Sequence, residues 1–100
     1  MKYVVMVYGA DAARRIPEVK AELAEVVSAE ELQLPSEGRI VRIRDEKQTA
    51  TAGPFVPADP QVAGIVLIDV ADDAGAEAVA ARISAIVGDR VELRGTLISA

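Results

Sequence analysis

Apolar runs and amphipathic stretches alternate along the chain. The run from Tyr3 to Tyr8 is rich in β-branched and aromatic residues and ends at Gly9, which is typical of a strand. The nearly continuous apolar run from Val62 to Val70 predicts a second strand. Successive side chains of a strand point to opposite faces of a sheet, and both runs are apolar on both faces. We therefore expect both strands in the centre of one sheet, buried on both sides.

An amphipathic segment and a pair of short extended runs follow the first strand. Apolar residues recur at helical spacing from Pro17, a favourable first helical residue, until the pattern weakens near Leu32 and is stopped by Pro35. This segment predicts a helix of about four turns. Residues 39–44 and 49–52 are two extended runs around a polar turn, and they predict a hairpin.

The second half of the chain adds a loop, a helix and a last strand. Residues 53–60 are rich in proline and predict a stiff loop without a long ladder of backbone hydrogen bonds. Asp72 or Asp73 is a suitable N-cap and Gly88 a suitable C-terminal residue for a second amphipathic helix. Residues 91–97 alternate between apolar and polar types, which predicts the final strand.

The order of these elements predicts an α+β fold. Strand, helix, hairpin strands, strand, helix and strand match a ferredoxin-like antiparallel sheet with two helices on one face. A chain of 100 residues has room for one core, so we expect residues 1–100 to form a single domain. Two helices cover only one face of a sheet. A second copy packed face to face is the economical cover for the other, which predicts a homodimer.

Composition narrows the function classes. The net charge of −5 and the pI near 4.6 argue against a nucleic-acid partner, because nucleic-acid affinity rests largely on Lys and Arg that neutralise phosphates. The absence of cysteine fits a reducing compartment, and we expect a cytoplasmic protein. The opening apolar run is too short for a signal peptide or a membrane span, so we expect no membrane contact.

The absence of histidine excludes a Ser-His-Asp triad and a His-based zinc site. A general base must then be a carboxylate, Tyr or Lys with a shifted pKa. Tyr8 and Asp69 end the two central strands and are candidate catalytic residues, with Asp69 as the base. These strands are expected to run antiparallel, which places the two residues at opposite edges of the sheet. We favour structural roles for both.

Arg42, Arg44 and Phe55 are candidate ligand-binding residues. Arg42 and Arg44 share one strand face and could clamp an anion, while Arg39 points to the other face. The alternative is that these charges protect an edge strand from aggregation. Phe55, the sole phenylalanine, could close a cleft as a lid, or it could pack into the core from a rigid turn. We favour the alternative to ligand binding in both cases.

We expect neither a metal site nor a cofactor. Glu18, Glu22 and Glu25 have helical spacing, but they lie opposite the apolar stripe and no histidine accompanies them, so they are interpreted as a solvated face. The glycines form neither a GxGxxG pattern nor a P-loop, which argues against a nucleotide site.

Residues 51–55, Thr-Ala-Gly-Pro-Phe, are followed after a gap by the apolar run 64–70 and an Ala-rich helix. This order is similar to the DGPF branch of the YCII-related family. The opening residues 1–9 and the closing run 91–94, Val-Glu-Leu-Arg, match that branch in kind and order. The resemblance implies a ferredoxin-like fold that dimerises through its sheets into an α+β barrel, in agreement with the argument from the two-faced strands.

The resemblance also bears on function. YCII-like relatives are proposed to use a His-Asp pair in a cleft, and a few are dehydrochlorinase-like, whereas this chain has no histidine and has Ala52 where the branch has Asp. We expect a homodimeric domain that binds a small molecule or a partner protein and is not a histidine-type acid–base enzyme. The alternative is a small-molecule lyase or isomerase that uses Tyr, Arg and carboxylate groups in the barrel cleft. An interaction role in transcription is a third possibility, since relatives are often associated with sigma-factor genes.

Overall fold

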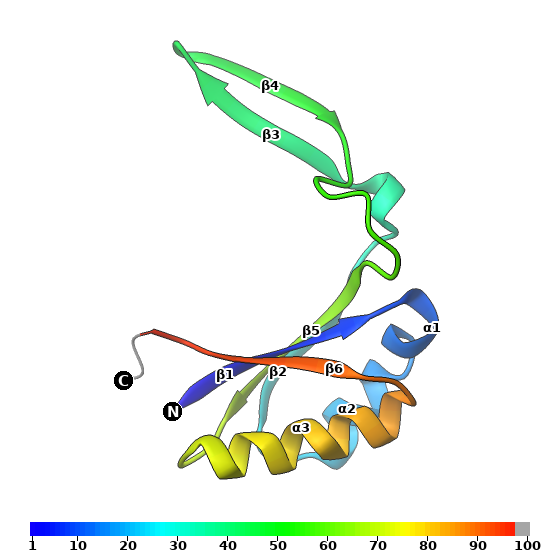
Figure 1. Ribbon diagram of the computed structural model, residues 1–100, viewed down its shortest axis with the longest axis vertical. Coiled ribbons are helices and arrows are strands. Elements are labelled where there is room, and N and C mark those ends of the chain that lie inside the picture. The colour runs from blue at the N-terminus through cyan, green and yellow to red at the C-terminus, as the bar shows by residue number, and fades with distance from the viewer. Residues whose placement is uncertain (98–100) are drawn as a thin grey trace.

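The computed structural model describes residues 1–97, which form a layered body and a hairpin that rises from one end of it (Figure 1). The elements in chain order are β1 (Lys2–Tyr8), α1 (Ala10–Ala13), α2 (Ile16–Glu22), β2 (Val26–Glu31), the 3₁₀ turn η1 (Pro35–Glu37), β3 (Arg39–Arg44), β4 (Lys47–Ala52), β5 (Val62–Asp69), α3 (Asp73–Val87) and β6 (Val91–Gly95). We call the hairpin β3–β4 the arm and the remaining strands and helices the body. Within residues 1–97, no helix is long and apolar enough to cross a lipid bilayer.

The four strands of the body form one antiparallel sheet in the order β2-β5-β1-β6. The two most apolar runs, β1 and β5, occupy its centre as predicted. Val5 of β1 lies opposite Val66 of β5 on one side and Leu93 of β6 on the other. This strand order, with α2 and α3 as connections, is the ferredoxin-like arrangement, and the arm is an insertion between β2 and β5.

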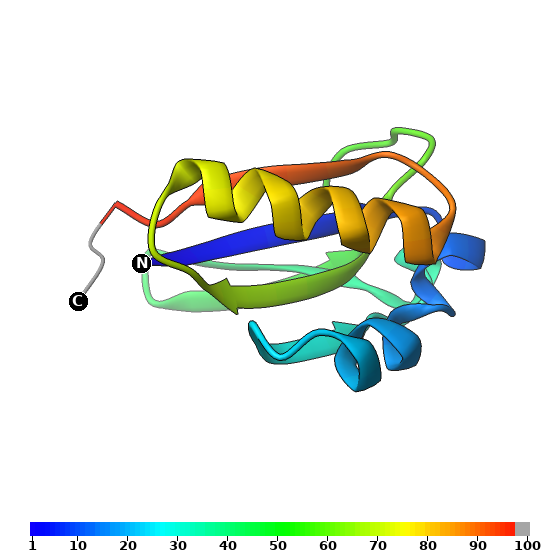
Figure 2. The same cartoon turned by 90° about the horizontal axis from the view of Figure 1, so that it is seen from below.

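The helices cover one face of the sheet (Figures 1 and 2). On that face, Val5 and Val66 of the central strands are fully buried, as are Val19 of α2 and Ile83 of α3. Burying an aliphatic side chain of this size stabilises a fold by roughly 1.5–3 kcal/mol. These contacts therefore hold both helices to the sheet and define the core.

The second helix predicted from the sequence is α3, and it begins and ends at the predicted capping residues. A side-chain oxygen of Asp72 accepts a hydrogen bond from the backbone N–H of Gly75 at 2.8 Å, which satisfies one donor of the first turn. At the other end, Gly88 adopts a φ of 79°, in the left-handed region that closes many helices. The prediction of this helix is confirmed.

The predicted helix from Pro17 to about Leu32 is wrong beyond Glu22. The helix ends there, and Val26–Glu31 forms strand β2 at the edge of the sheet. The apolar spacing of this segment is helical, but pairing with β5 satisfies the backbone groups of both strands and buries Ala29 opposite Val66. Tertiary pairing thus overrides the local periodicity.

Close packing of α2 on the sheet depends on Gly64 in β5. A Cβ added at this position would lie 2.0 Å from Cδ1 of Ile16 and 3.3 Å from the carbonyl oxygen of Glu30. Ile16 begins α2 and is buried. The missing side chain of Gly64 therefore provides the space that Ile16 occupies.

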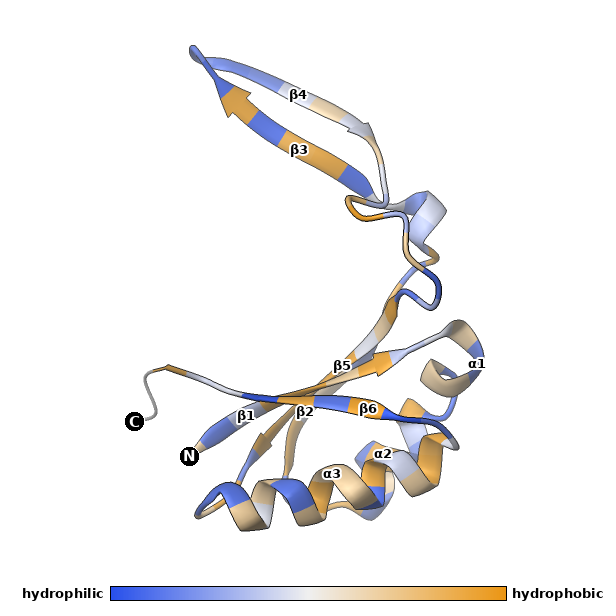
Figure 3. Ribbon diagram, in the orientation of Figure 1, coloured by the Kyte–Doolittle hydropathy of each residue, from blue (hydrophilic) through white to orange (hydrophobic). Residues whose placement is uncertain are grey.

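The other face of the sheet, which we call the open face, has no cover within the chain. Val4, Met6 and Leu67 are half-buried there, and Ile65 is exposed. Hydropathy colouring shows how apolar the two central strands are (Figure 3). Within one copy of the chain, the central strands are therefore buried on the helix face alone, and cover of the open face by a second copy stays a prediction.

The predicted hairpin is confirmed, but it does not join the sheet of the body. Strands β3 and β4 pair antiparallel as a separate two-stranded sheet, because β2 already occupies the edge beside β5. The tip is a tight turn in which Asp45 and Glu46 have φ values of 50° and 63°, as type I′ hairpin turns require. Two perpendicular views place the arm over the open face of the sheet (Figures 1 and 2).

Candidate functional site

A cavity of about 540 Å³ opens where the arm leaves the body. Its apolar lining includes Leu32, Leu34, Ile40, Pro54 and Phe55. A second cavity of about 410 Å³ also contains residues 32–35 and Gln61 in its lining. Since the two cavities have these residues in common, we treat them as one feature and call it the junction groove.

The loop 53–60 forms one wall of this groove. Its shape is fixed by Gln61, whose side-chain amide donates hydrogen bonds to the backbone oxygens of Val56 at 2.6 Å and Ala58 at 2.7 Å. The loop contains no strand, so the prediction of a segment without a long backbone ladder is confirmed. One side chain of the body thus holds the wall in place.

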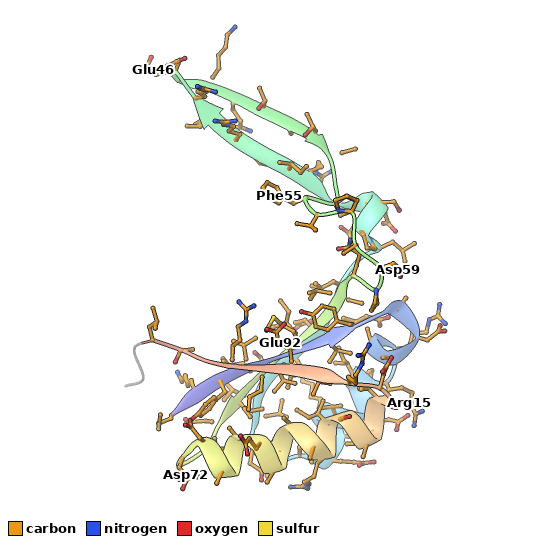
Figure 4. The ribbon with its side chains drawn as sticks, in the orientation of Figure 1. Arg15, Glu46, Phe55, Asp59, Asp72 and Glu92 are labelled. Carbon is orange, nitrogen blue, oxygen red and sulfur yellow. The ribbon has the colours of Figure 1, made fainter. Side chains whose placement is uncertain are left out.

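Phe55 lies at the junction of arm and body and is 82% exposed (Figure 4). The favoured prediction that it packs into the core is therefore wrong. The backbone N–H of Gly53 donates to the Gly38 carbonyl oxygen at 2.9 Å, and this contact keeps the start of the loop at the base of the arm. The core lies on the helix side of the sheet, so Phe55 contributes to the groove instead.

Arg39 is the charged side chain in the lining of the larger cavity. Among residues 1–97 it forms no ion pair, whereas Arg14 in the smaller cavity donates to the carboxylate of Asp11 at 2.8 Å. A guanidinium without a carboxylate partner, set beside apolar walls, favours an anionic group on an otherwise apolar ligand.

Arg42 and Arg44 occupy the face of the arm opposite to Arg39. Strand alternation places them there, and their cross-strand neighbours are Thr49 and Lys47. This is the arrangement that the sequence predicts. Neither residue lines the junction groove, so Phe55 is the candidate ligand-binding residue that the structure brings to it.

A polar network lies on the open face. Tyr8 donates a hydrogen bond from its hydroxyl to Oε1 of Glu92 at 2.6 Å, and Nε of Arg94 donates to Oε2 of the same carboxylate at 2.8 Å. The hydrogen bond to Glu92 raises the pKa of Tyr8, and the bonds from Tyr8 and Arg94 lower the pKa of Glu92. Tyr8 is thus held as a neutral donor and Glu92 as an anion.

A cavity of about 320 Å³ adjoins this network and includes Tyr8, Arg90 and Glu92 in its lining. Glu92 points away from the helix layer (Figure 4). Sequence reasoning selected Tyr8 but missed its partners. The sequence pattern that could have identified these partners is the alternation in β6, which puts Glu92 and Arg94 on one face of the strand.

Asp69 lies at the opposite end of the sheet from Tyr8. In the antiparallel pairing of β1 with β5, Lys2 is opposite Asp69 and Tyr8 is opposite Val62. Oδ1 of Asp69 accepts a hydrogen bond from the N-terminal ammonium group of Met1 at 3.0 Å, and both groups are more than half exposed. The expected separation of the two candidate catalytic residues is confirmed, and one copy of the chain does not bring them together.

Comparison of the sequence with protein-family models shows which family this chain belongs to. The model described as the YCII-related domain matches residues 1–94. The chain belongs to the YCII-related family. No curated protein matches it. The matched residues include both the body and the arm, so the residues that line the groove lie within the matched range.

In this YCII-related domain, the motif related to DGPF forms part of the groove wall. Gly53, Pro54 and Phe55 line the larger cavity, and Ala52 ends β4 directly opposite Arg39. Directly opposed residues of an antiparallel pair have Cβ atoms about 4.5–5.5 Å apart, so an acidic residue at position 52 would neighbour Arg39. With alanine at position 52, β4 places no carboxylate opposite the Arg39 guanidinium.

The three glutamates of the predicted first helix do not form one face. Glu18 accepts two hydrogen bonds from the Arg15 guanidinium, at 2.7 and 2.9 Å, which lowers the pKa of Glu18. Glu25 lies beyond α2 and contacts Arg82 at 3.4 Å. Within residues 1–97, no group of acidic side chains is arranged to hold a metal ion.

Tyr3 forms a second tyrosine–carboxylate contact, on the helix face. Its hydroxyl donates to Oδ1 of Asp73, and this hydrogen bond raises the pKa of Tyr3 to about 12. The ring is buried, while Asp73 opens α3. This contact links the first strand to the start of the last helix, which is a structural role.

Proposed function

We propose that this YCII-related domain is a homodimeric binding module for a small apolar molecule that carries one anionic group. The observation that carries this proposal is the larger cavity of the junction groove, where apolar side chains lie beside a guanidinium, Arg39, that forms no ion pair among residues 1–97, whereas the carboxylates of the groove line the smaller cavity. Ligand sites are typically concave and mostly apolar, with a few polar groups that fix orientation. A carboxylate on an aromatic or aliphatic ligand satisfies both features.

The homodimer is supported by the open face. Val4, Met6, Ile65 and Leu67 form its apolar centre, and the helices of the same copy lie on the other side. An isologous contact between two such faces covers both at once. The cysteine-free sequence supports placing this module in a reducing compartment, the cytoplasm.

The test uses benzoate as the probe and benzyl alcohol as its neutral control, each titrated into ¹⁵N-labelled protein and followed by NMR. We expect benzoate to shift the amide signals of Gly38, Gly53 and Phe55 and to bind about three- to tenfold more tightly than the alcohol, because a net hydrogen bond at the exposed guanidinium of Arg39 contributes about 0.5–1.5 kcal/mol. In Arg39→Gln the preference for benzoate should disappear. A preference that survives in Arg39→Gln, or shifts confined to other residues, would refute the groove as the site.

Two further variants sharpen this test. Ala52→Asp places a carboxylate opposite Arg39 and should weaken benzoate binding. Thr51→Asp places the same charge on the other face of the arm and should leave most of the benzoate affinity unchanged. If Arg42→Gln abolishes binding and Arg39→Gln does not, the anion sits on the face of Arg42 and Arg44, as the sequence-based hypothesis has it.

The second candidate function is a small-molecule lyase or isomerase, and the cavity of about 320 Å³ beside Tyr8 is the observation that favours it. Because Glu92 accepts the hydroxyl proton of Tyr8 in a hydrogen bond and raises the pKa of Tyr8, a tyrosinate base is disfavoured, and the tyrosine would contact a substrate as a neutral hydroxyl that turns its O–H away from Glu92. Asp69, the candidate base, would act at a separate place. If a substrate is found, Tyr8→Phe should lower kcat with the fold intact, whereas unchanged turnover would remove this function.

A further inference from the structure

The two cavities of the junction groove carry opposite charges. The lining of the smaller cavity includes three carboxylates, which come from the end of β2, from η1 and from loop 53–60: Glu31, Glu37 and Asp59. Among residues 1–97, the charged residue that lines the larger cavity is Arg39. A ligand that occupies both cavities therefore meets carboxylates in one and a guanidinium in the other.

The chain does not neutralise the carboxylates of the smaller cavity. The cation in the same lining is Arg14, whose guanidinium donates to the carboxylate of Asp11 at 2.8 Å. In the part of the chain that the structure describes, none of the three carboxylates forms an ion pair. Three carboxylates against one guanidinium give the lining a net charge of −2. A cavity with such an excess of negative charge attracts a cationic group.

The spacing of these carboxylates suits an organic cation rather than a metal ion. They belong to three separate segments, and over residues 1–97 no group of acidic side chains is close enough to hold a metal ion. A protonated amine carries one charge and three N–H donors, so it can contact carboxylates that lie apart. The smaller cavity therefore favours an ammonium group.

Gln61 lies in the lining of both cavities and offers a further acceptor. Its side-chain nitrogen donates to the backbone oxygens of Val56 and Ala58, and a reversed amide would turn Oε1 toward these two oxygens. The orientation of the amide is therefore fixed. Within residues 1–97 no donor contacts Oε1, so this oxygen is available to an N–H group of a ligand.

The residues common to both cavities form an apolar wall. Leu32 and Leu34 belong to both linings and are 42% and 53% exposed. Along loop 53–60, Phe55 lies at the base of the arm and Asp59 lies closer to the body (Figure 4). An apolar spacer on Leu32 and Leu34 would join a group beside Arg39 to a group in the smaller cavity.

We infer that the ligand of the junction groove is a zwitterion, with an amine and a carboxylate at opposite ends of an apolar spacer. Its carboxylate pairs with Arg39, its spacer lies on the leucines of the shared wall, and its ammonium group enters the smaller cavity. This inference rests on the proposed function, which supplies the apolar and anionic parts of the ligand, and it adds the second charge.

The experiment compares 4-(aminomethyl)benzoate with 4-ethylbenzoate by NMR titration of ¹⁵N-labelled protein. The two probes have nearly the same size and the same carboxylate, but only the first carries an ammonium group. In the triple variant Glu31→Gln, Glu37→Gln, Asp59→Asn, the affinity ratio of the first probe to the second should fall about two- to fivefold, as expected when an exposed ion pair is lost. Taking the ratio cancels the contribution of the apolar parts.

Glu30→Gln is the matched control for Glu31→Gln. Both residues are exposed in β2, but strand alternation puts them on opposite faces, and Glu30 lines neither cavity. The affinity ratio in Glu30→Gln should equal that of wild type. If Glu30→Gln lowers the ratio as much as Glu31→Gln does, the overall negative charge of the chain explains the preference and the inference is overturned.

Arg39→Gln separates this inference from the proposed function. We expect it to weaken both probes by the same factor. If Arg39→Gln weakens 4-ethylbenzoate and the triple variant leaves the ratio at its wild-type value, the anion site stands and the zwitterion is overturned. If Arg39→Gln leaves both affinities unchanged, the proposed function and this inference both fail. All substituted side chains are exposed, so the amide spectra of the variants should show the wild-type fold.

Discussion

Gly64 and Ile16 form a pair whose energetics can be worked out from their geometry. In Gly64→Ala, the new Cβ would lie 2.0 Å from Cδ1 of Ile16, well inside van der Waals contact. Ile16 is buried, so its side chain has to repack rather than swing into solvent. Overpacking of this kind costs about 1–3 kcal/mol. Loss of the glycine also restricts the unfolded chain, which stabilises by about 0.4–1 kcal/mol. We therefore expect a net destabilisation of up to about 2.6 kcal/mol from these two effects.

Ile16→Val removes the methyl group that causes the clash. Alone, it should destabilise the domain by about 0.5–1.5 kcal/mol. In the Ile16→Val background the overpacking is relieved, so Gly64→Ala should change sign and stabilise by about 0.4–1 kcal/mol. The same substitution is thus predicted to be harmful in one background and beneficial in the other.

Urea denaturation followed by circular dichroism measures all four members of this double-mutant cycle. Ile83→Val provides the matched control, because it deletes the same methyl group from a fully buried residue of α3. Gly64→Ala combined with Ile83→Val should be additive. Additivity in the Ile16→Val cycle as well would show that the close approach of α2 to β5 does not limit the packing, and the reasoning would fail.

Three more measurements follow from the polar contacts and the loop. In an alkaline titration at 295 nm, Tyr3 should ionise near pH 12, and earlier ionisation would contradict its contact with Asp73. The folded pKa of Tyr3 lies above the unfolded value of 10.0, so the stabilisation from this contact is present below pH 10 and is lost as the pH rises toward 12. Glu92→Gln should lower the pKa of Tyr8 toward its ordinary value, and an unchanged alkaline titration of this tyrosine would argue against their hydrogen bond. Hydrogen exchange should be faster for the amides of loop 53–60 than for those of β5, and equal protection would indicate a strand that the structure lacks.

The body was predictable where one local signal dominated. The apolar runs of β1 and β5 identify central strands, and the cap at Asp72 with the glycine at position 88 marks α3. The segment 26–31 was misassigned because its apolar residues continue the helical spacing of α2. Only the unsatisfied edge of β5 explains why this segment is a strand, and that edge is a property of the assembled sheet.

The candidate site was harder to predict from the sequence, because the residues that form it are far apart along the chain. Tyr8 and Glu92 are 84 positions apart in the chain, and nothing in either local pattern pairs them. The hairpin was predicted as an element, yet its separation from the main sheet depends on which strand occupies the edge. Phe55 comes three residues after the end of β4, at the base of this separate hairpin, and therefore lies outside the core.

The hydrogen bond between Gly53 and Gly38 brings the two ends of the arm together at its base. A hairpin that enters and leaves the body at one point behaves as an insertion, because its removal or extension leaves the spacing of the flanking strands unchanged. The chain can gain or lose opposed residue pairs in β3 and β4 without shifting the register of β5 against β1. The arm can therefore differ in length and sequence between homologous chains while the fold of the body is preserved.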